Sequence, residues 1–555
     1  MDTATLLERD IVFSSVFEVQ LIKGPDVYEI LTNEQFLTNW DKLYDRCPWS
    51  TVFQSRDFVT TWYSTFKDSY FPIIVKYESE GQLFGLLTMA IKNKNDGGKL
   101  FIVAAGHGEA DCQTWLATAS TSDQFIIEAL RAILKEFPRE DILIRHTPPD
   151  VPLNWTVNKE KGFGLVVESF TRPLLQLDGF SISKRNRKRV NRLEKLGKHV
   201  EVANYDEFSK LLEQLTLLYD FRQGAMFNRT PYRNNPAYSE LLLSLYKKNV
   251  LKVSVLKVGN EIIAGLIVIV GKGIAHLGGI NVHSPSFARY SPGYVQFLLM
   301  GQTLALQKIK YLDLTPGGDP YKDRIATTYD QVHTLTISRN SKFILKRQVR
   351  LMVHRWLLKT GVRPLSFQLF LERQKYLLKK RGGYSFLSNY IKAKFRKPVL
   401  IPYRIVISST SSGIYQVSRN CISDLLSYRQ SDSALTEWEF LESAMQNFER
   451  EYEVFTSLNQ NDLAMAIWFR NFADEESAPE LGRCIILKDL YATPSSVGNL
   501  PNFLNEVVAQ LSELYKPEKI YYIDNSHQIK SWASYTSKIF AKEDNIQTES
   551  LLKLI

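Results

Sequence analysis

The stretch SPGYVQFLLMGQTLALQKIKYLDLTPGGDPYK, residues 291–322, contains the pattern that best indicates how this 555-residue chain folds. Apolar runs on either side of its Ser-Pro-Gly turn predict strands over 251–258, 261–270, 273–280 and 310–314 and a helix over 294–308. A strand followed by a glycine turn and a helix leaves free backbone N–H groups at the positive end of the helix dipole. Because phosphates bind at such places, the stretch predicts a diphosphate cradle.

The cradle gives three candidate donor-binding residues, Ser291, Gly293 and Tyr294. Their backbone N–H groups would hold a diphosphate, and Gly293 would let the backbone approach it closely. The alternative is that Ser-Pro-Gly is only a turn that starts a helix. In either case the pattern favours an enzyme that transfers a group from a nucleotide-linked donor.

The segment after the helix contributes further candidates. Asp313 ends a short predicted strand, where its carboxylate could deprotonate an acceptor; alternatively it caps the loop toward Gly318. Tyr321 and Lys322 follow Gly317 and Gly318 and could polarise the donor or hold an anionic acceptor. Lys322 could equally be solvated.

Two predicted helices supply the remaining candidates. Tyr219 and Arg222 are three residues apart and share a helix face, which could line an acceptor pocket or could be ordinary packing. Arg185 and Arg187 lie in a strongly basic helix over 181–196 that could clamp phosphates or an acidic glycan, or could be a solvated face. No Ser/His/Asp or Cys/His pattern predicts a covalent intermediate.

The order of predicted elements indicates a duplicated α/β fold with α+β layers. Helix, helix, strands, helix and strand occur in two successive units, and a similar order restarts near residue 399. We therefore predict an N-terminal extension over 1–26, a first unit over 27–170, a second unit over 171–335, a helical connector over 336–398 and a C-terminal domain over 399–555.

Positive charge is concentrated in the connector. Between residues 339 and 397 there are 17 Lys or Arg residues and one acid, Glu372, so the net charge of this segment is +16. Since the net charge of the whole chain is +10, the remaining residues have a net charge of −6. Apolar residues recur among these bases at helical spacing, which suits either packing on a neighbouring domain or binding to an anionic membrane surface. No RNA- or DNA-binding motif is present, and we do not expect a nucleic-acid partner.

Four widely spaced cysteines, Cys47, Cys112, Cys421 and Cys484, indicate reduced thiols rather than a metal site, and we predict no metal. The first residues lack the pattern of a signal peptide, and the longest apolar run, 262–270, is too short to span a bilayer. These features predict a cytoplasmic protein, with peripheral membrane contact through the basic connector as an option.

Residues 27–325 resemble the GNAT-type acyltransferases of the CelD class, which are associated with cellulose and exopolysaccharide biosynthesis and are related to the FemABX transferases. The resemblance is carried by Pro48-Trp49, Phe53-Gln54, Trp62, the 106–111 loop before Trp115, the basic run 184–189, Tyr219, Arg222, Ser291-Pro292-Gly293, Asp313, Gly317-Gly318 and Tyr321-Lys322. It implies tandem GNAT-like units with central mixed sheets, and transfer of an acyl group from acyl-CoA, most simply acetyl-CoA, as a co-substrate with no bound cofactor.

The C-terminal domain resembles a third, degenerate GNAT-like unit. At its expected CoA turn it has Ser495-Ser496-Val497-Gly498-Asn499-Leu500, which lacks both the first basic or amide position and the last small position of the family pattern. We therefore expect a structural or partner-binding role for this domain.

The preferred hypothesis is direct acyl transfer to a saccharide or amine acceptor in polysaccharide or cell-envelope metabolism. One alternative is a Fem-like transferase that uses aminoacyl-tRNA. Another is a scaffold without catalysis that is recruited to a membrane complex.

Overall fold

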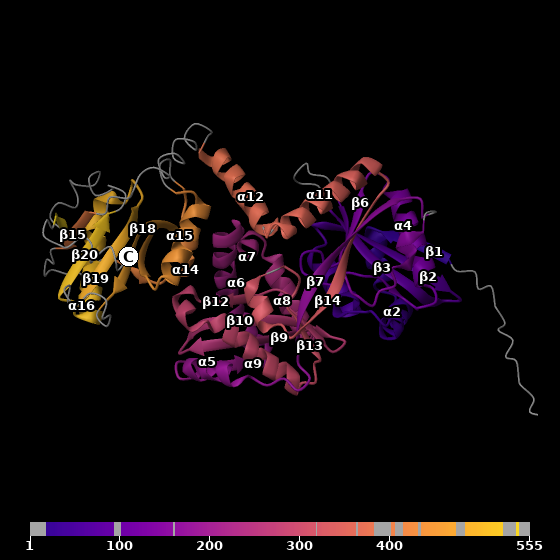
Figure 1. Ribbon diagram of the computed structural model, residues 1–555, viewed down its shortest axis with the longest axis horizontal. Coiled ribbons are helices and arrows are strands. Elements are labelled where there is room, and N and C mark those ends of the chain that lie inside the picture. The colour runs from indigo at the N-terminus through magenta and orange to yellow at the C-terminus, as the bar shows by residue number, and fades with distance from the viewer. Residues whose placement is uncertain are drawn as a thin grey trace, which may run out of the picture.

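The computed structural model describes residues 18–93, 101–158, 161–317, 319–361, 364–381, 401–405, 415–430, 435–472, 483–524 and 540–542. Two mixed sheets organise the described part of the chain, one of fourteen strands and one of seven. Figure 1 shows the large sheet with its helices at the centre and right, and the smaller sheet at the left. The fold is thus α/β, with tandem units followed by a third.

The first unit builds one end of the large sheet. Its elements are β1 (Glu18–Lys23), α1 (Pro25–Ile30), α2 (Glu34–Arg46), α3 (Arg56–Thr65), β2 (Tyr70–Ser79), β3 (Gln82–Lys92), β4 (Phe101–Ala104), β5 (Leu116–Ala117), α4 (Ser122–Glu136) and β6 (Asp141–Thr147). The Asn33 side chain accepts a hydrogen bond from the backbone N–H of Phe36 and so caps the start of α2. β1, from the predicted N-terminal extension, pairs with β2 at the edge of the sheet.

The second unit builds the other end. Its elements are β7 (Gly164–Gln176), α5 (Lys184–Glu194), β8 (Lys198–Glu201), α6 (Tyr205–Phe227), α7 (Pro231–Asn234), α8 (Ala237–Lys247), β9 (Leu251–Val258), β10 (Glu261–Gly271), β11 (Ile274–His276), β12 (Asn281–His283), α9 (Pro292–Leu306), β13 (Tyr311–Asp313), α10 (Pro320–Ile325) and β14 (Thr328–Ser338).

The strand predicted over 273–280 is wrong in its extent. It is interrupted after His276, which pairs with Ile269 of β10, and β12 then resumes antiparallel pairing further along β10 from Asn281. Gly279 has φ 102°, which favours glycine, and a Cβ at Gly278 would lie only 2.3 Å from Ile269 Cδ1. This glycine pair interrupts the strand because Gly279 has a backbone conformation outside the β region and Gly278 passes close against β10.

The two units exchange strands. β14 pairs antiparallel with β7 along its whole length, β14 also pairs with β6 of the first unit, and β7 also pairs with β13 of the second. The predicted unit boundaries at 170/171 and 335/336 therefore fall inside β7 and β14. One continuous sheet results, so the two units share a backbone hydrogen-bond network.

Two helices, α11 (Ser341–Lys359) and α12 (Pro364–Arg381), follow β14. α11 lies along β7 and β14, where Ile344 is buried against Gly164. α12 reaches the C-terminal domain, where the ring of Tyr376 packs edge-on to that of Trp438. In Figure 1 the two helices form a V along the upper edge. The rest of the predicted connector, 382–398, lies outside the described residues.

The C-terminal domain holds the seven-stranded sheet. Its elements are β15 (Ile401–Ile405), β16 (Ser418–Arg419), α14 (Ile422–Leu426), α15 (Glu437–Glu449), β17 (Glu453–Asn459), β18 (Asp462–Asn471), β19 (Cys484–Ala492), α16 (Leu500–Tyr515), β20 (Lys519–Asp524) and β21 (Phe540–Lys542). β19 and β20 are parallel, and the earlier strand β15 lies antiparallel beside β20. The second unit has the same arrangement in β11, β13 and β7, which supports a third GNAT-like unit.

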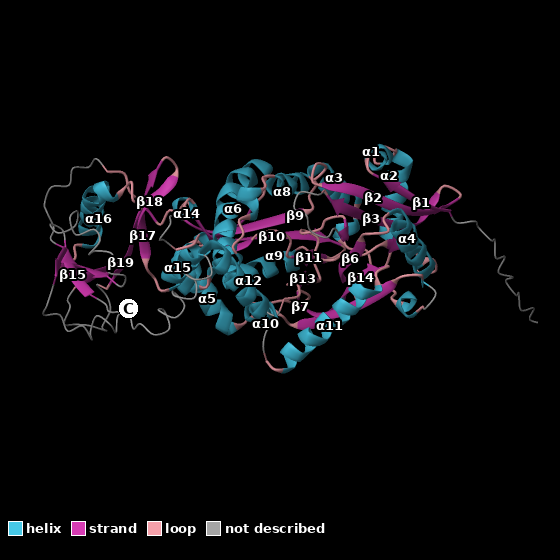
Figure 2. Ribbon diagram, turned by 90° about the horizontal axis from the view of Figure 1, so that it is seen from above, coloured by secondary structure: helices cyan, strands magenta, loops and turns pink. Residues whose placement is uncertain are grey.

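The C-terminal domain packs against the second unit through α15 and α6. Trp438 Nε1 donates to the carbonyl of Ala225 at 3.1 Å, and Arg233 Nη1 donates to the carbonyl of Leu426 at 2.6 Å. Figure 2, seen from above, places α15 next to α6 as well. The domain is therefore docked beside the second unit rather than beside the first.

Candidate functional site

A cavity of about 770 Å³ opens at the N-terminus of α9. Six of the sequence-predicted residues line it: Arg185, Arg222, Ser291, Gly293, Tyr294 and Tyr321. They come from α5, α6, α9 and α10, so the fold of the second unit brings four separate segments to one hollow. The other lining residues are Ser183, Asn186, Arg189, Asn281, His283, Ala288, Pro292, Phe297 and Arg324.

The start of α9 forms one wall. Ser291 is in the left-handed region, with φ 52° and ψ 49°, and Pro292 occupies the first turn of the helix. A Cβ on Gly293 would lie 3.3 Å from Nδ1 of His283, which is a tight approach. The positive end of a fifteen-residue helix therefore faces the cavity, with a small residue where a ligand can come close.

Four arginines surround this helix end: Arg185, Arg189, Arg222 and Arg324. The guanidinium of Arg189 lies 5.5 Å from the centre of the Tyr294 ring, and Asn186 Nδ2 donates to the Tyr294 hydroxyl at 3.1 Å. Arg187 is exposed and does not line the cavity. Since no Asp or Glu is found among the described residues that line it, the cavity suits a ligand with several negative charges.

The opposite wall is held by a hydrogen-bonded chain. Arg222 Nη1 donates to the carbonyl of Asn281 at 2.8 Å, and Asn281 Nδ2 donates to the Tyr321 hydroxyl at 3.4 Å. Burial, with the nearby charge of Arg222, lowers the pKa of His283 to about 4. The imidazole of His283 is therefore neutral at neutral pH and can accept a hydrogen bond inside the cavity.

Asp313 lies in the interior rather than in the cavity. Its side chain has no exposed surface. Oδ2 accepts from Nδ1 of His276 at 3.0 Å and from Nη1 of Arg172 at 3.0 Å, and Oδ1 accepts from the backbone N–H of Thr315 at 2.8 Å. These contacts come from β11, β7 and the following loop, and they fix the end of β13.

Burial acts to raise the pKa of Asp313, but the hydrogen bond from His276 and the charge of Arg172 outweigh it and hold the pKa at about 2. A carboxylate held in this way is a weak proton acceptor. Its place in the network suits a positioning role for the end of β13 and the loop that follows.

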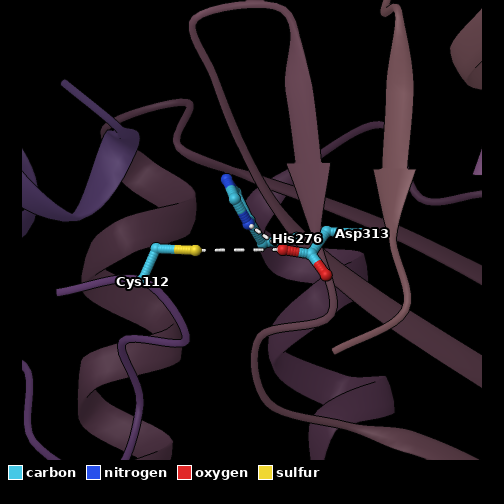
Figure 3. A group of neighbouring side chains, drawn as sticks. All are labelled: Cys112, His276 and Asp313. Atoms are coloured by element: carbon cyan, nitrogen blue, oxygen red, sulfur yellow. Dashed lines mark hydrogen bonds and ion pairs between the residues drawn. The ribbon is translucent and has the colours of Figure 1, made fainter. Parts of the chain in front are cut away.

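Figure 3 shows Cys112, His276 and Asp313 converging in this interior group, with the thiol and the imidazole both directed at the Asp313 carboxylate. The Cys112 Sγ lies 3.9 Å from Oδ2 of Asp313, and Arg172 Nη1 lies 3.2 Å from the same sulfur. These three residues could in principle ligate a metal, yet the guanidinium of Arg172 already supplies the positive charge at this place.

The remaining predicted residues lie around this group. Lys322 is buried, and its Nζ donates to Thr315 Oγ1 at 2.8 Å. Gly317 is exposed, and a Cβ there would lie 3.4 Å from Lys322 Nζ. Gly318 lies outside the described residues. The predicted Tyr321-Lys322 pair is thus divided, with Tyr321 at the cavity and Lys322 behind it.

A carboxyl from the first unit reaches the same region. Glu109, in the loop after β4, has its pKa raised to about 7 by burial. The pKa of Tyr219 is raised to about 12, chiefly by burial. The negative charge of Glu109 raises this pKa further, and its effect is larger than the opposite effect of Arg222. Asp111, two residues later, also has its pKa raised, by burial and by the nearby Asp313. Tyr219 does not line the cavity, but the charges of Glu109 and Asp111 of the first unit and of Arg222 of the cavity all act on it.

The sequence analysis missed several members of the site. Asn281, His283 and Arg324 gave no motif, because single polar residues at strand ends and in a short helix are common. Arg189 belongs to the basic cluster that the sequence predicts could clamp phosphates together with Arg185 and Arg187, but only the orientation of α5 places Arg189 at the cavity and Arg187 away from it. Glu109 lies in the 106–111 loop that contributes to the family resemblance, but the sequence of this loop does not show that the Glu109 carboxyl is buried.

Residues 181–323 match the model of the acetyltransferase (GNAT) domain family. This range contains every residue that lines the cavity except Arg324. The second unit is therefore similar to GNAT acetyltransferase domains, and its cavity lies within the matched range. No curated protein sequence matches the chain.

Solved structures that resemble the chain include FemX, with a TM-score of 0.42 and 10% identity over 56% of this chain and 97% of that one. A protein of unknown function from Bacteroides thetaiotaomicron has a TM-score of 0.36 and 10% identity, over 55% of this chain and 97% of that one. A tandem GNAT protein from the clavulanic acid biosynthesis pathway has a TM-score of 0.35 and 12% identity, over 57% of this chain and 98% of that one.

Within the described part of the chain, no helix combines the length and the apolar character needed to cross a membrane.

Proposed function

We propose that the protein transfers an acyl group from acyl-CoA, such as acetyl-CoA, to a hydroxyl or amine acceptor. The observation that carries the proposal is the cavity in which the N-terminus of α9 meets four arginines with no carboxylate among the described lining residues. CoA carries a diphosphate and a further phosphate. The helix end suits the diphosphate, and arginines bind phosphate oxygens in pairs.

In the proposed mechanism the cavity holds the donor and the first unit supplies the base. The acceptor attacks the thioester carbonyl, its proton passes to Glu109, the C–S bond breaks and a C–N or C–O bond forms. Tyr219, protonated at neutral pH because its pKa is about 12, gives a proton to the leaving thiolate. Glu109 then returns its proton to Tyr219, which restores both groups.

Two further residues have supporting roles in this proposal. Lys322 holds the loop after β13 through its hydrogen bond to Thr315. Its positive charge also acts to lower the pKa of Asp111. Asp313 fixes the end of β13 through His276 and Arg172. Direct transfer needs such fixed geometry, because the acceptor, the thioester and the base must be aligned at the same time.

The acceptor that we propose is a saccharide or an amine, in cytoplasmic polysaccharide or cell-envelope metabolism. The resemblance of residues 27–325 to the CelD class supports this choice. The acceptor would enter between the two units, where Glu109 and Asp111 of the first unit meet Tyr219 of the second.

Calorimetry of the full chain against acetyl-CoA, longer acyl-CoAs, free CoA and an aminoacyl-tRNA tests the donor. We expect saturable binding of the CoA compounds and none of the tRNA. The opposite result would favour an aminoacyl-tRNA-dependent transferase. Binding of neither, together with an unchanged cellular phenotype for Gly293→Trp, would favour a scaffold without catalysis.

Glu109→Gln tests the base. Because Glu109 must be ionised to accept a proton and its pKa is about 7, the wild-type transfer rate should rise with pH through about 7. The variant should lose about 100-fold in rate, within the range for general bases, and should lose this step in its pH profile. The exposed Glu80→Gln is the matched control and should keep both. An unchanged profile in Glu109→Gln would assign the proton to another group.

A further inference from the structure

The helix α11 has two apolar faces. One packs on the sheet: Ile344 is buried, the Phe343 ring lies 6.0 Å from that of Phe101, and His354 lies 6.5 Å from Phe170. The other faces solvent and holds five large apolar residues at helical spacing: Leu345 (60% exposed), Val349 (47%), Met352 (59%), Val353 (50%) and Trp356 (62%). A helix that only connects domains needs the first face and gains nothing from the second.

The helix α12 repeats this arrangement. One side packs on the C-terminal domain through Tyr376 and through Arg373, whose Nη2 lies 2.6 Å from Oε2 of Glu442. Four apolar side chains remain exposed at helical spacing: Phe367, Phe370, Leu371 and Leu378. The two consecutive helices therefore present nine large apolar side chains on these two faces, and Leu358 of α11, 56% exposed, lies outside its stripe; scattered single ones are ordinary.

The charges around these side chains have one sign. α11 contains six Lys or Arg residues and no acid, and α12 contains five with one acid, Glu372. On α11 the exposed bases lie on both sides of the apolar stripe, with Lys342, Lys346 and Arg350 on one side and Arg355 and Lys359 on the other. An apolar stripe between two rows of bases matches a surface that is apolar inside and anionic at its boundary.

We propose that α11 and α12 bind the surface of an anionic lipid bilayer. The stripe of Leu345, Met352 and Trp356 would enter the boundary between headgroups and acyl chains, and the flanking bases would pair with lipid phosphates. A second copy of the chain is a poorer occupant, because two such faces would bring their bases together without acids to balance them.

The two helices lie away from the cavity. In Figure 1 α11 and α12 run along the upper edge, whereas α5 and α9, which border the cavity, lie along the lower edge. A membrane-bound molecule would thus keep the cavity open, and lipid binding can be measured independently of CoA binding.

Cosedimentation of the full chain with vesicles tests the proposal. We expect binding to vesicles of phosphatidylcholine mixed with phosphatidylglycerol, little binding to phosphatidylcholine alone, and weaker binding at high salt. The triple variant Leu345→Gln/Met352→Gln/Trp356→Gln should reduce partitioning about 100-fold. The control Val157→Gln/Leu306→Gln/Leu514→Gln removes three exposed apolar side chains elsewhere and should bind like the wild type.

A second variant isolates the charge. Lys342→Glu/Lys346→Glu/Arg350→Glu should also reduce binding to the anionic vesicles, with the melting temperature and CoA affinity unchanged. Equal binding to neutral and anionic vesicles, or full binding by either variant, would overturn the proposal. Sedimentation velocity tests whether a second copy of the chain binds the stripe instead. A wild-type dimer that becomes a monomer in the triple apolar variant would show that the stripe is a dimer interface.

Discussion

The second unit and the C-terminal domain share a backbone frame but differ at the start of the helix that connects their two parallel strands, which is α9 between β11 and β13 and α16 between β19 and β20. In the second unit α9 begins at a left-handed Ser291, next to a helix, α5, whose arginines line a cavity. In the C-terminal domain the residue that caps the start of α16, Asn499, is right-handed, with φ −92° and ψ 0°. Residues 406–417, between β15 and β16, contain no Lys or Arg, whereas the segment between β7 and β8 contains α5. The start of α9 therefore has neighbouring arginines that add to the positive field of the helix end.

Buried charge is also used differently in the two. In the second unit Asp313 is bound by Arg172 and His276. In the C-terminal domain Lys488 lies 3.8 Å from the centre of the Tyr452 ring, and burial lowers its pKa. The Asp313 group links the three strands β7, β11 and β13 near the cavity. The contact between Lys488 and Tyr452 lies inside the C-terminal domain and serves its packing.

The largest expected effect is on stability, through Asp313→Asn. Removing one partner of a buried ion pair leaves Arg172 with an unbalanced charge on that side and should cost about 3–5 kcal/mol in the free energy of unfolding of the fourteen-stranded part. The transition of the C-terminal domain should not move, which calorimetry of the two transitions checks.

The pH dependence of the same variant has a defined sign. The pKa of Asp313 is lowered from 3.8 to about 2, so its stabilising contribution is present above the ordinary value and is lost as the pH falls toward 2. The wild type should lose stability over that interval more steeply than Asp313→Asn. Parallel curves would show that the carboxylate contributes nothing through its ionisation.

The next effect is on donor binding, through Gly293→Trp. An indole at the tight approach to His283 should fill the turn and reduce acyl-CoA affinity by about 100-fold or more, since it blocks close contact of the phosphates with the helix end. The matched variant Gly498→Trp has open space around its Cβ position and should leave affinity unchanged. If both variants lost affinity equally, the two helix starts would be equivalent and the comparison above would fail.

The smallest effect comes from single arginines of α5. Arg189→Gln removes one of the charged contacts that we propose for the donor and should weaken acyl-CoA binding about tenfold, or about 1.4 kcal/mol. Arg187→Gln, on the same helix but away from the cavity, should weaken it by less than about twofold once salt screens its long-range field. Titration at two salt concentrations measures both, and equal losses would indicate a diffuse charge effect rather than a site.

Much of the local structure could be predicted because its causes are local. The Asn33 cap of α2, the β2–β3 hairpin and the start of α9 follow from capping side chains, alternation and turn residues that lie within a few positions of one another. The same turn chemistry singles out Ser291 and Gly293, whereas only the packing of α6 brings Arg222 beside them. The break after His276 could not be predicted, because the effect of Gly278 and Gly279 depends on their contact with the neighbouring strand β10.

The sequence by itself determined that this chain forms layered α/β units, that a helix starts at a Ser-Pro-Gly turn, and that positive charge gathers in one helical segment, because periodicity, turn chemistry and charge are properties of neighbouring residues. Only the tertiary structure decided that β14 joins the first unit, that Asp313 is tied to His276 and Arg172, and that Glu109 has a pKa near 7. Pairing between strands far apart in the chain, and the loss of water around a carboxyl, arise from packing and leave no local pattern.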